Sequence, residues 1–407
     1  MTNRWQVGVA TSLLALVWSS PAIAQKVTVV EELTASGALS QLTGPLGARP
    51  VAEAIGFATA LEIATTPLML ASGNFHFTLD PATGLLVRTQ TTFGPAFAER
   101  AETSGEGTVT VGASFTSITY EKLSDLNLDR MQLGSVTAAS PTVARTGVAN
   151  LGLNAKIVVI SGVVGVTQNF DIAVGVPLVT LELDGTTTLT NDAGVVSRLA
   201  EGGGKFSGLG DVSAIAKYRF ARFGSELNDT GGLAALVNIR LPTGDRGNLR
   251  GLGITRTLAS LVYSGAMGRI RPHANAGYEY WSKGVSVPTN YATGESVTAR
   301  HQIQYAAGIE VEAAPKVTLM ATFLGRHIQD AGQVGFVTDI PGPNASGITA
   351  LESAVALSEG TRKMMLAPGL KVNLKGKLLL SLHALATLEN DGLKADLAPV
   401  VGLDLTF

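Results

Sequence analysis

Hydrophobic and polar positions alternate along most of the chain, in segments of about ten to fourteen residues divided by clusters of Gly, Asn and Asp. In segment 268–281, Tyr278 and Tyr280 share one face, whereas Arg271 and Glu279 share the other. A period of two residues is typical of β-strands, since successive side chains point to opposite faces. The pattern therefore predicts an all-β fold.

About 12 such segments follow one another in the second part of the chain. They lie at residues 106–121, 148–161, 167–182, 209–220, 231–243, 252–265, 268–282, 300–313, 316–330, 361–374, 377–391 and 394–407. In a soluble sandwich the polar face meets solvent, whereas in a transmembrane barrel it lines a polar lumen. The alternation is the same in both folds, but an even number of strands is what a bacterial barrel requires.

The lengths of the connections favour the barrel. Tight connections are expected at Gly162–Val166, Gly265–Gly268, Ala313–Pro315 and Leu374–Lys377, with a somewhat longer one at Arg222–Gly231. Between them lie long stretches rich in Gly, Ser, Thr, Asn and Asp, at 122–147, 183–208, 283–299 and 331–360, and two short ones near 243–251 and 391–394. Short periplasmic turns that alternate with longer external loops are typical of outer-membrane barrels. A Greek-key sandwich has no reason to alternate in this way.

The composition is consistent with a protein that is largely surrounded by lipid. The 407 residues are 45% hydrophobic and only 15% charged, whereas a soluble enzyme carries about a quarter charged residues. No segment after the N-terminal leader offers the ~20 consecutive apolar residues of a transmembrane helix. A barrel reconciles these facts, because only alternate residues of each strand face lipid.

The N-terminus has the features of a secretory signal peptide. Arg4 provides the positive charge, an apolar stretch covers about 7–17, and small residues precede Ala24. We predict that residues 1–24 are the signal peptide and that cleavage leaves Gln25 first. The alternative is an uncleaved membrane anchor.

The last strand carries a second export feature. Phe407 is the final residue, Leu405 lies two positions before it, and Gly402 lies five before it. This spacing resembles the signal that the barrel-assembly machinery reads, although Val400 stands where a polar residue is commoner. We expect Gly402, Leu405 and Phe407 to form that signal.

Residues 25–105 do not follow the strand rhythm that marks 106–407 as the barrel. A short amphipathic helix is predicted at 49–64, with a stripe formed by Val51, Ile55, Ala58 and Leu61. The segment has three possible places: a plug in the lumen, a periplasmic extension, or an added hairpin that raises the strand count to about 14.

The sequence offers little chemistry. The chain has no cysteine and a net charge of −2, which excludes thiol-based sites and gives no case for nucleic acid. No His-Glu-x-x-His or Gly-x-Ser-x-Gly motif occurs, and the Gly-rich run 201–210 does not open a helix in a βαβ unit. His273 and His383 fall on the predicted lumen face, whereas outer-membrane lipases place Ser and His toward lipid. We expect no enzymatic activity, no metal and no cofactor.

Ionisable side chains on the polar face are the candidate lumen-lining residues. They are Asp171, Asp211, Lys217, Arg219, Arg240, Arg271, His273, Glu279, Glu310 and Arg326. Both signs are present, which favours a hydrogen-bonded and partly filled interior over a strongly ion-selective pore. About 12 strands also lie below the 16–18 strands of open porins. For any one of these residues, structural interlocking is the simpler interpretation.

Several motifs resemble one family of outer-membrane proteins. They are GLGDVSAIAKYRF at 208–220, VNIRLPTGD at 237–245, RPHANAGYEYW at 271–281, FDIAVGVPLVTLEL at 170–183 and FGPAFAERAETSGEG at 93–107. The resemblance is to the family labelled "MetA-pathway of phenol degradation" and covers roughly 90–325 with the closing strand. Its members are described as transporters, similar in outline to the fatty-acid and aromatic-hydrocarbon uptake barrels. The N-terminal glycine-rich signature of the fatty-acid transporters is not evident.

We therefore expect an outer-membrane channel or transporter for passive uptake of small hydrophobic or aromatic molecules. Its expected partners are outer-membrane lipid, the barrel-assembly machinery and the small-molecule solute. A second hypothesis is a non-transporting structural or adhesion barrel that acts through the external loops 122–147, 183–208 and 331–360. A third is an outer-membrane hydrolase that uses His273 or His383, and a fourth is a soluble secreted β protein.

Overall fold

The computed structural model describes eleven stretches of the chain. They are residues 55–71, 77–79, 86–88, 92–124, 126–137, 140–190, 196–225, 228–290, 295–338, 352–389 and 391–407. The expected cleavage site at Ala24 and the helix residue Val51 lie outside them.

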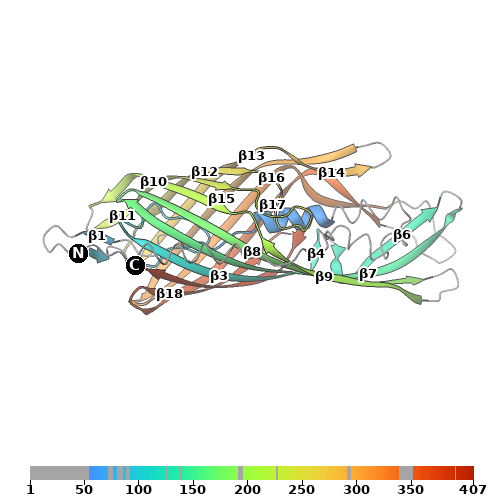
Figure 1. Ribbon diagram of the computed structural model, residues 1–407, viewed down its shortest axis with the longest axis horizontal. Coiled ribbons are helices and arrows are strands. Elements are labelled where there is room, and N and C mark those ends of the chain that lie inside the picture. Colours follow the sequence, from blue (N-terminus) through green and yellow to red (C-terminus); the bar gives the residue numbers. More distant parts are fainter. Residues whose placement is uncertain are drawn as a thin grey trace.

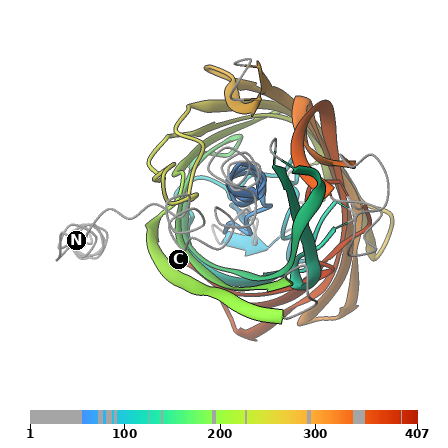
Figure 2. The ribbon, with the colours of Figure 1, turned by 90° about the vertical axis from the view of Figure 1, so that its right-hand side faces the viewer.

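Twelve antiparallel strands form a closed barrel (Figure 1, Figure 2). They are β3 (Val109–Tyr120), β7 (Ser140–Thr167), β8 (Phe170–Thr190), β10 (Ser213–Gly224), β11 (Asp229–Arg240), β12 (Arg256–Gly265), β13 (Ile270–Trp281), β15 (Glu295–Ala314), β16 (Val317–Thr338), β17 (Glu352–Lys375), β18 (Leu378–Thr387) and β20 (Leu397–Thr406). The cylinder closes where β20 pairs with β3, from Thr406↔Thr110 to Val400↔Thr116. The predicted fold class is confirmed.

The two faces of each strand differ as the alternation predicts. Outward side chains are mostly apolar, as with Tyr218 (54% exposed) and Leu261 (64% exposed). Inward side chains include buried charges such as Lys217 and Glu279 and buried apolar residues such as Leu324. A closed barrel with an apolar exterior is the form that outer-membrane proteins take. The expected location in the bacterial outer membrane follows from this barrel. No helix among the described residues is long and apolar enough to cross a membrane.

The turn between β7 and β8 lies later in the chain than predicted. The connection expected at Gly162–Val166 is part of β7, and the chain turns instead at Gln168 and Asn169. Gly165 lies within the strand, and the backbone of Gly105 packs directly against it. A side chain at position 165 would overlap that backbone. The glycine therefore marks a close approach of two backbones rather than a turn.

The stretches predicted as long external loops contain paired strands. They hold β6 (Met131–Thr137), β9 (Val196–Leu209), β14 (Val285–Asn290) and the outer parts of β7, β8, β15, β16 and β17. A three-stranded sheet of β4 (Lys122–Leu123), β5 (Leu126–Asn127) and β19 (Leu393–Lys394) lies beside the short helix η1 (Leu128–Arg130). These stretches are rich in Thr and Val, which favour strands, and pairing satisfies their backbone groups.

Within its described residues, the N-terminal part of the chain adds no strand to the barrel. β1 (Phe77–Leu79) and β2 (Leu86–Arg88) pair with each other in a separate two-stranded sheet. The alternative of about 14 barrel strands is therefore wrong for this chain.

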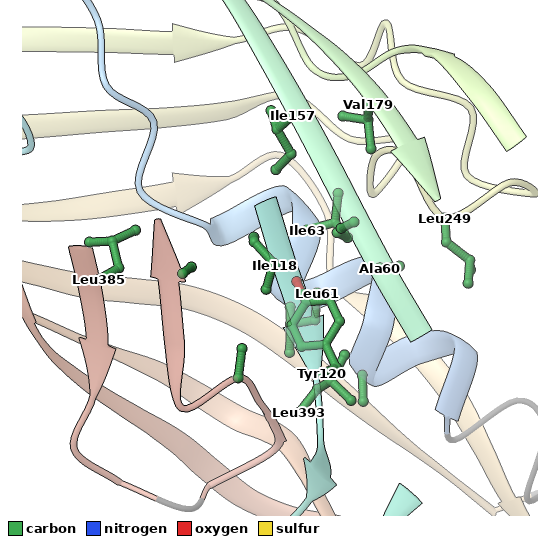
Figure 3. Packing of buried hydrophobic residues seen from close by; sticks show 14 of the residues in the cluster. Ala60, Leu61, Ile63, Ile118, Tyr120, Ile157, Val179, Leu249, Leu385 and Leu393 are labelled. Atoms are coloured by element: carbon green, nitrogen blue, oxygen red, sulfur yellow. The ribbon is translucent and has the colours of Figure 1, made fainter. Parts of the chain in front are cut away.

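Residues 55–65 form a helix that lies inside the barrel, seen end-on in Figure 2. It is buried on almost every side, and Figure 3 shows Leu61 beside Ile118 and Tyr120 of β3. The hydroxyls of Thr59 and Thr65 donate to the carbonyls four residues earlier, at 2.8 and 2.6 Å, so the buried polar groups of these side chains are satisfied.

The outward apolar side chains of the barrel strands form a belt that faces lipid, and this belt generates a stability prediction. Leu261→Lys places a charge on the apolar exterior near the middle of β12, and we expect a loss of about 2–4 kcal/mol. Ser207→Lys makes a similar change on the outward face of β9, beyond the belt, and should cost less than about 1 kcal/mol. Denaturant unfolding of both variants in lipid vesicles measures the difference. Equal losses would contradict the assignment of the lipid-facing surface.

Candidate functional site

Residues 92–105 cross the barrel interior near the periplasmic turns. Their backbone amides donate to inward side chains of five strands: Phe93 N to Thr318 Oγ1 (3.2 Å), Gly94 N to Glu310 Oε2 (3.0 Å), Glu99 N to Asn275 Oδ1 (3.0 Å), Ala101 N to Ser264 Oγ (3.2 Å) and Ser104 N to Asp171 Oδ2 (2.9 Å). An extended segment with no strand partners needs such acceptors, because a buried amide without one is costly. The inward polar face thus serves as the binding surface for this segment.

Charges on the same segment pair with charges on the barrel wall. Lys217 Nζ lies 3.1 Å from Glu99 Oε2, and Arg271 Nη1 lies 3.4 Å from Glu102 Oε1. The ammonium of Lys371 donates to the carbonyl of Pro95 at 3.1 Å. A charge is tolerated in a protein interior when it is paired and hydrogen-bonded. The segment therefore neutralises part of the lumen as it fills it.

Arg219 and His273 are among the candidate residues with partners in the wall itself. Arg219 binds Asp229 with two hydrogen bonds of 2.5 and 2.6 Å, a bidentate pair within the β10–β11 hairpin. His273 Nε2 lies 3.3 Å from the hydroxyl of Thr322, and its Nδ1 lies 3.7 Å from Glu310. These contacts link β10 to β11, and β13 to β15 and β16.

Three arginines hold the C-terminal end of the helix near the external end of the barrel. Arg256 Nη2 donates to the carbonyl of Ala64 at 2.8 Å, and Arg240 Nη1 donates to the same carbonyl at 3.3 Å. Arg326 Nη1 donates to the carbonyl of Thr65 at 2.5 Å. The last carbonyls of a helix have no partner within it, and cations are favoured there. The wall therefore supplies the C-cap of this helix.

Behind these arginines lie two buried carboxylates. Glu279 Oε1 accepts hydrogen bonds from Gln302 at 2.7 Å and from the indole of Trp281 at 2.9 Å, and lies 3.5 Å from Arg256. Asp211 Oδ2 lies 3.3 Å from Arg256 on its other side. Arg256 is fully buried and connects both carboxylates to the helix.

Glu62 also attaches the helix to the barrel wall. Its carboxylate lies 2.6 Å from Arg326 Nη2 and 3.5 Å from Lys363 Nζ. Glu62 lies on this helix and not on a membrane-spanning strand. Burial alone would raise the pKa of its carboxyl group. The charges and hydrogen bonds of Arg326 and Lys363 outweigh burial and hold the pKa below its ordinary value. Glu62 is therefore a carboxylate at neutral pH.

Sequence reasoning missed several charged residues that take part in this network. They are Glu62, Glu99, Glu102, Arg256, Lys363 and Lys371. The last three share the inward parity of their strands, so the alternation that selected the other candidates could have found them. The three glutamates belong to segments without a strand period, where no pattern shows which way a side chain points.

A cavity of about 170 Å³ remains between the helix and residues 92–105. Apolar side chains form much of its lining, among them Leu70, Phe97, Ile215, Leu236 and Leu324. The polar lining includes Glu99, Asn238, Arg240, Arg326 and Lys363. Of the ten candidate residues, the structure brings Arg240 and Arg326 to this cavity.

The three residues of the expected assembly signal lie at the periplasmic end of β20. Leu405 and Phe407 face outward, at 40% and 57% exposure. Gly402 faces inward, where a side chain would overlap Met69 of the N-terminal segment. The overlapping atom is the terminal methyl of the flexible Met69 side chain, so packing does not by itself require glycine here. The reading of Gly402 by the assembly machinery stays a prediction.

The described residues hold no group of three or more His, Cys, Asp or Glu side chains that could bind a metal. His383 is buried, with its ring edge-on to Phe97 at 5.6 Å between centroids. Neither of its ring nitrogens has a hydrogen-bond partner within the described stretches.

Comparison with known proteins gives a likeness of fold. No protein-family model matches the sequence, and no curated protein matches it. Among solved structures, the COG4313 outer membrane channel from Pseudomonas putida F1 is 13% identical, with a TM-score of 0.44 over 75% of this chain and 98% of that one. The Ralstonia pickettii toluene transporter TbuX is 12% identical, with a TM-score of 0.34 over 74% and 90%. A Pseudomonas aeruginosa FadL homologue is 12% identical, with a TM-score of 0.31 over 84% and 98%. These values assign no family, and the resemblance of the motifs stays a prediction.

The position of Arg256 generates a prediction about stability. Arg256→Ala leaves Asp211 and Glu279 with less compensation in a buried site, and we expect a loss of about 3–5 kcal/mol. Lys205→Ala removes an exposed partner of Glu182 and should cost at most about 1 kcal/mol. Unfolding in detergent, followed by the faster gel migration of folded barrels, compares the two. A loss at Arg256 no larger than that at Lys205 would overturn the role given to this arginine.

Glu62 generates a prediction about pH. Because its folded pKa is lowered, its contribution to docking of the helix is complete above the unfolded pKa of 4.5 and is lost as pH falls through the folded value. Hydrogen exchange of the helix amides should therefore show weaker protection in acid. Glu62→Gln should lower protection at pH ~7 and make it less sensitive to acid.

A matched control is Glu106→Gln, which changes an exposed residue beyond the end of the plugging segment. It should behave as the wild type does at each pH. If Glu62→Gln keeps wild-type protection and its acid dependence, the pairs with Arg326 and Lys363 do not hold the helix.

Proposed function

We propose that this chain is an outer-membrane channel for passive uptake of small hydrophobic or aromatic molecules. The observation that carries the proposal is the cavity of about 170 Å³ inside a barrel that side chains and N-terminal segments otherwise fill. An apolar cavity of about 150 Å³ in a protein core suffices to hold benzene. The cavity volume therefore fits one ring-sized solute. It is too small for an open water-filled pore.

In this proposal residues 25–105 form the plug of a barrel made by 106–407, after residues 1–24 are removed as a signal peptide. The helix 55–65 lies on the external side of the cavity and residues 92–105 lie on the periplasmic side. Transport then requires a displacement of these segments. The segment 92–105 has no strand partners, so it can shift without breaking the barrel.

A second candidate function has one observation in its favour. β7 has 28 residues and β17 has 24, whereas a membrane-spanning strand needs about 9–11. More than half of each therefore lies beyond the lipid belt, as does the whole of β9. A structural or adhesion barrel would use this projecting surface, and its binding would be lost when the external part of the β8–β9 hairpin is removed.

Filling the cavity tests the transport proposal. Ala306 lies on the inward face of β15 and lines the cavity, so Ala306→Phe should occupy much of its volume. Ala307→Phe adds the same side chain to the lipid face of the same strand. We expect Ala306→Phe to lower uptake of a labelled aromatic solute by intact cells about tenfold or more, and Ala307→Phe to leave uptake unchanged.

Cells without the protein give the background rate. Wild-type uptake equal to that background would contradict the transport proposal. Equal uptake by both variants would show that the solute does not pass through this cavity.

A further inference from the structure

The cavity has a cationic end and an apolar end. On the paired strands β16 and β17, Arg326 and Lys363 lie opposite each other, and Leu324 and Met365 form the next inward pair toward the periplasm. On β11, Arg240 lines the external end and Leu236 lies four residues nearer the periplasm. Three strands thus repeat one order, with a cation above an apolar side chain. A neutral hydrocarbon would form no ion pair or hydrogen bond with these cations.

The three cations are not equally committed to other partners. Arg326 and Lys363 share the carboxylate of Glu62, at 2.6 and 3.5 Å. The contacts of Arg240 are longer: 3.3 Å to the carbonyl of Ala64 and 3.7 Å to Glu279. Within the described residues the Nε atoms of Arg240 and Arg326 both lack a hydrogen-bond partner, so the longer contacts are what distinguish Arg240. Arg240 is therefore the cation held least tightly by its present partners.

A second polar group beside Arg240 also lacks a partner. Asn238 lies two residues before Arg240 on the same inward face, lines the cavity and is only 7% exposed. Its side-chain oxygen has no hydrogen-bond partner in the described part of the protein. That oxygen is an acceptor, and a carboxylate brings no donor to it, so the unpaired oxygen does not itself argue for an anion. The NH2 group of the same amide is the donor that Asn238 offers to a carboxylate.

The approach to this end of the cavity is also cationic. A smaller cavity of about 20 Å³ lies toward the external side of the barrel, and Arg250 and Arg256 line it together with Arg240. Arg240 thus faces both spaces. Asp211 is the carboxylate in the lining of the smaller cavity, and it pairs with Arg256. A series of arginines therefore leads from the loop between β11 and β12 to the cavity.

We propose that the cavity binds a small monocarboxylate with an apolar body, such as a single-ring aromatic acid. Its carboxylate accepts hydrogen bonds from Arg240 and from the Asn238 amide, and its ring lies among Leu236, Leu324 and Met365. A guanidinium presents paired N–H donors that match a carboxylate. This inference rests on the proposed function, which it narrows from aromatic molecules in general to those that carry one negative charge.

The test compares two probes of the same shape, benzoate and uncharged benzyl alcohol. Equilibrium binding to the full-length protein in detergent should favour benzoate. Arg240→Gln should weaken benzoate binding about ten- to hundred-fold, the loss expected for hydrogen bonds to a charged group, and weaken benzyl alcohol binding much less. Arg362→Gln is the matched control, because Arg362 is the exposed, outward neighbour of Lys363 on β17. It should bind both probes as the wild type does.

Two further variants keep the test decisive. Arg240→Lys retains the charge and should keep part of the preference for benzoate, whereas Asn238→Leu should reduce it without adding charge. Folding of each variant is checked by gel migration before heating. If Arg240→Gln does not fold, these two variants decide the outcome. The inference is overturned if wild type does not prefer benzoate, or if every folded variant at Arg240 and Asn238 keeps the wild-type preference.

Failure of this inference is distinguishable from failure of the proposed function. Uptake of an uncharged aromatic solute through the cavity, without any preference for benzoate, would leave the channel in place and remove the carboxylate site. Absence of uptake for both kinds of solute would remove the channel itself.

Discussion

Backbone amides and carbonyls that enter the hydrocarbon core must find partners on neighbouring strands, because lipid offers them none. In this chain the requirement is met where β20 joins β3, with Leu403 opposite Ala113. Closure leaves no free edge, and it also forces every second side chain into a space shut off from bulk water. The inward charges of the barrel strands are a consequence of that geometry. Their desolvation is the problem that the rest of the structure has to solve.

The N-terminal segments solve it with opposite charges and with backbone groups. Glu62, Glu99 and Glu102 each meet a wall cation, and the carbonyls at the end of the helix meet wall guanidiniums. The same contacts that neutralise the lumen also occlude it. The described N-terminal segments are therefore part of the stability of the barrel, and moving them out of the lumen carries an electrostatic cost as well as a loss of packing.

The sequence predicts the barrel well because its signal is periodic and local. Each strand repeats the alternation, and parity alone places residues such as Lys217 and Glu279 inside. The end of β7 was misplaced since Gly165 looks like a turn residue, and only the three-dimensional approach of Gly105 explains it. The sequence also does not show which charged residues pair with one another. Nothing local in Glu62 indicates that it lies against Arg326, because that contact depends on where a helix docks across 264 positions of sequence.

At the cavity, the charges that bind the helix and the surface available to a ligand meet. Arg326 and Lys363 face the cavity while they bind Glu62, so the cations that anchor the helix and the cations available to a ligand overlap. A carboxylate bound near Arg240 would also be attracted by the positive charges of Arg326 and Lys363, which hold Glu62 in place. Binding and docking then compete for one set of charges, and thermodynamic linkage requires each to weaken the other. If such a carboxylate binds as proposed, it weakens the electrostatic contacts that hold the helix, which lies on the external side of the cavity.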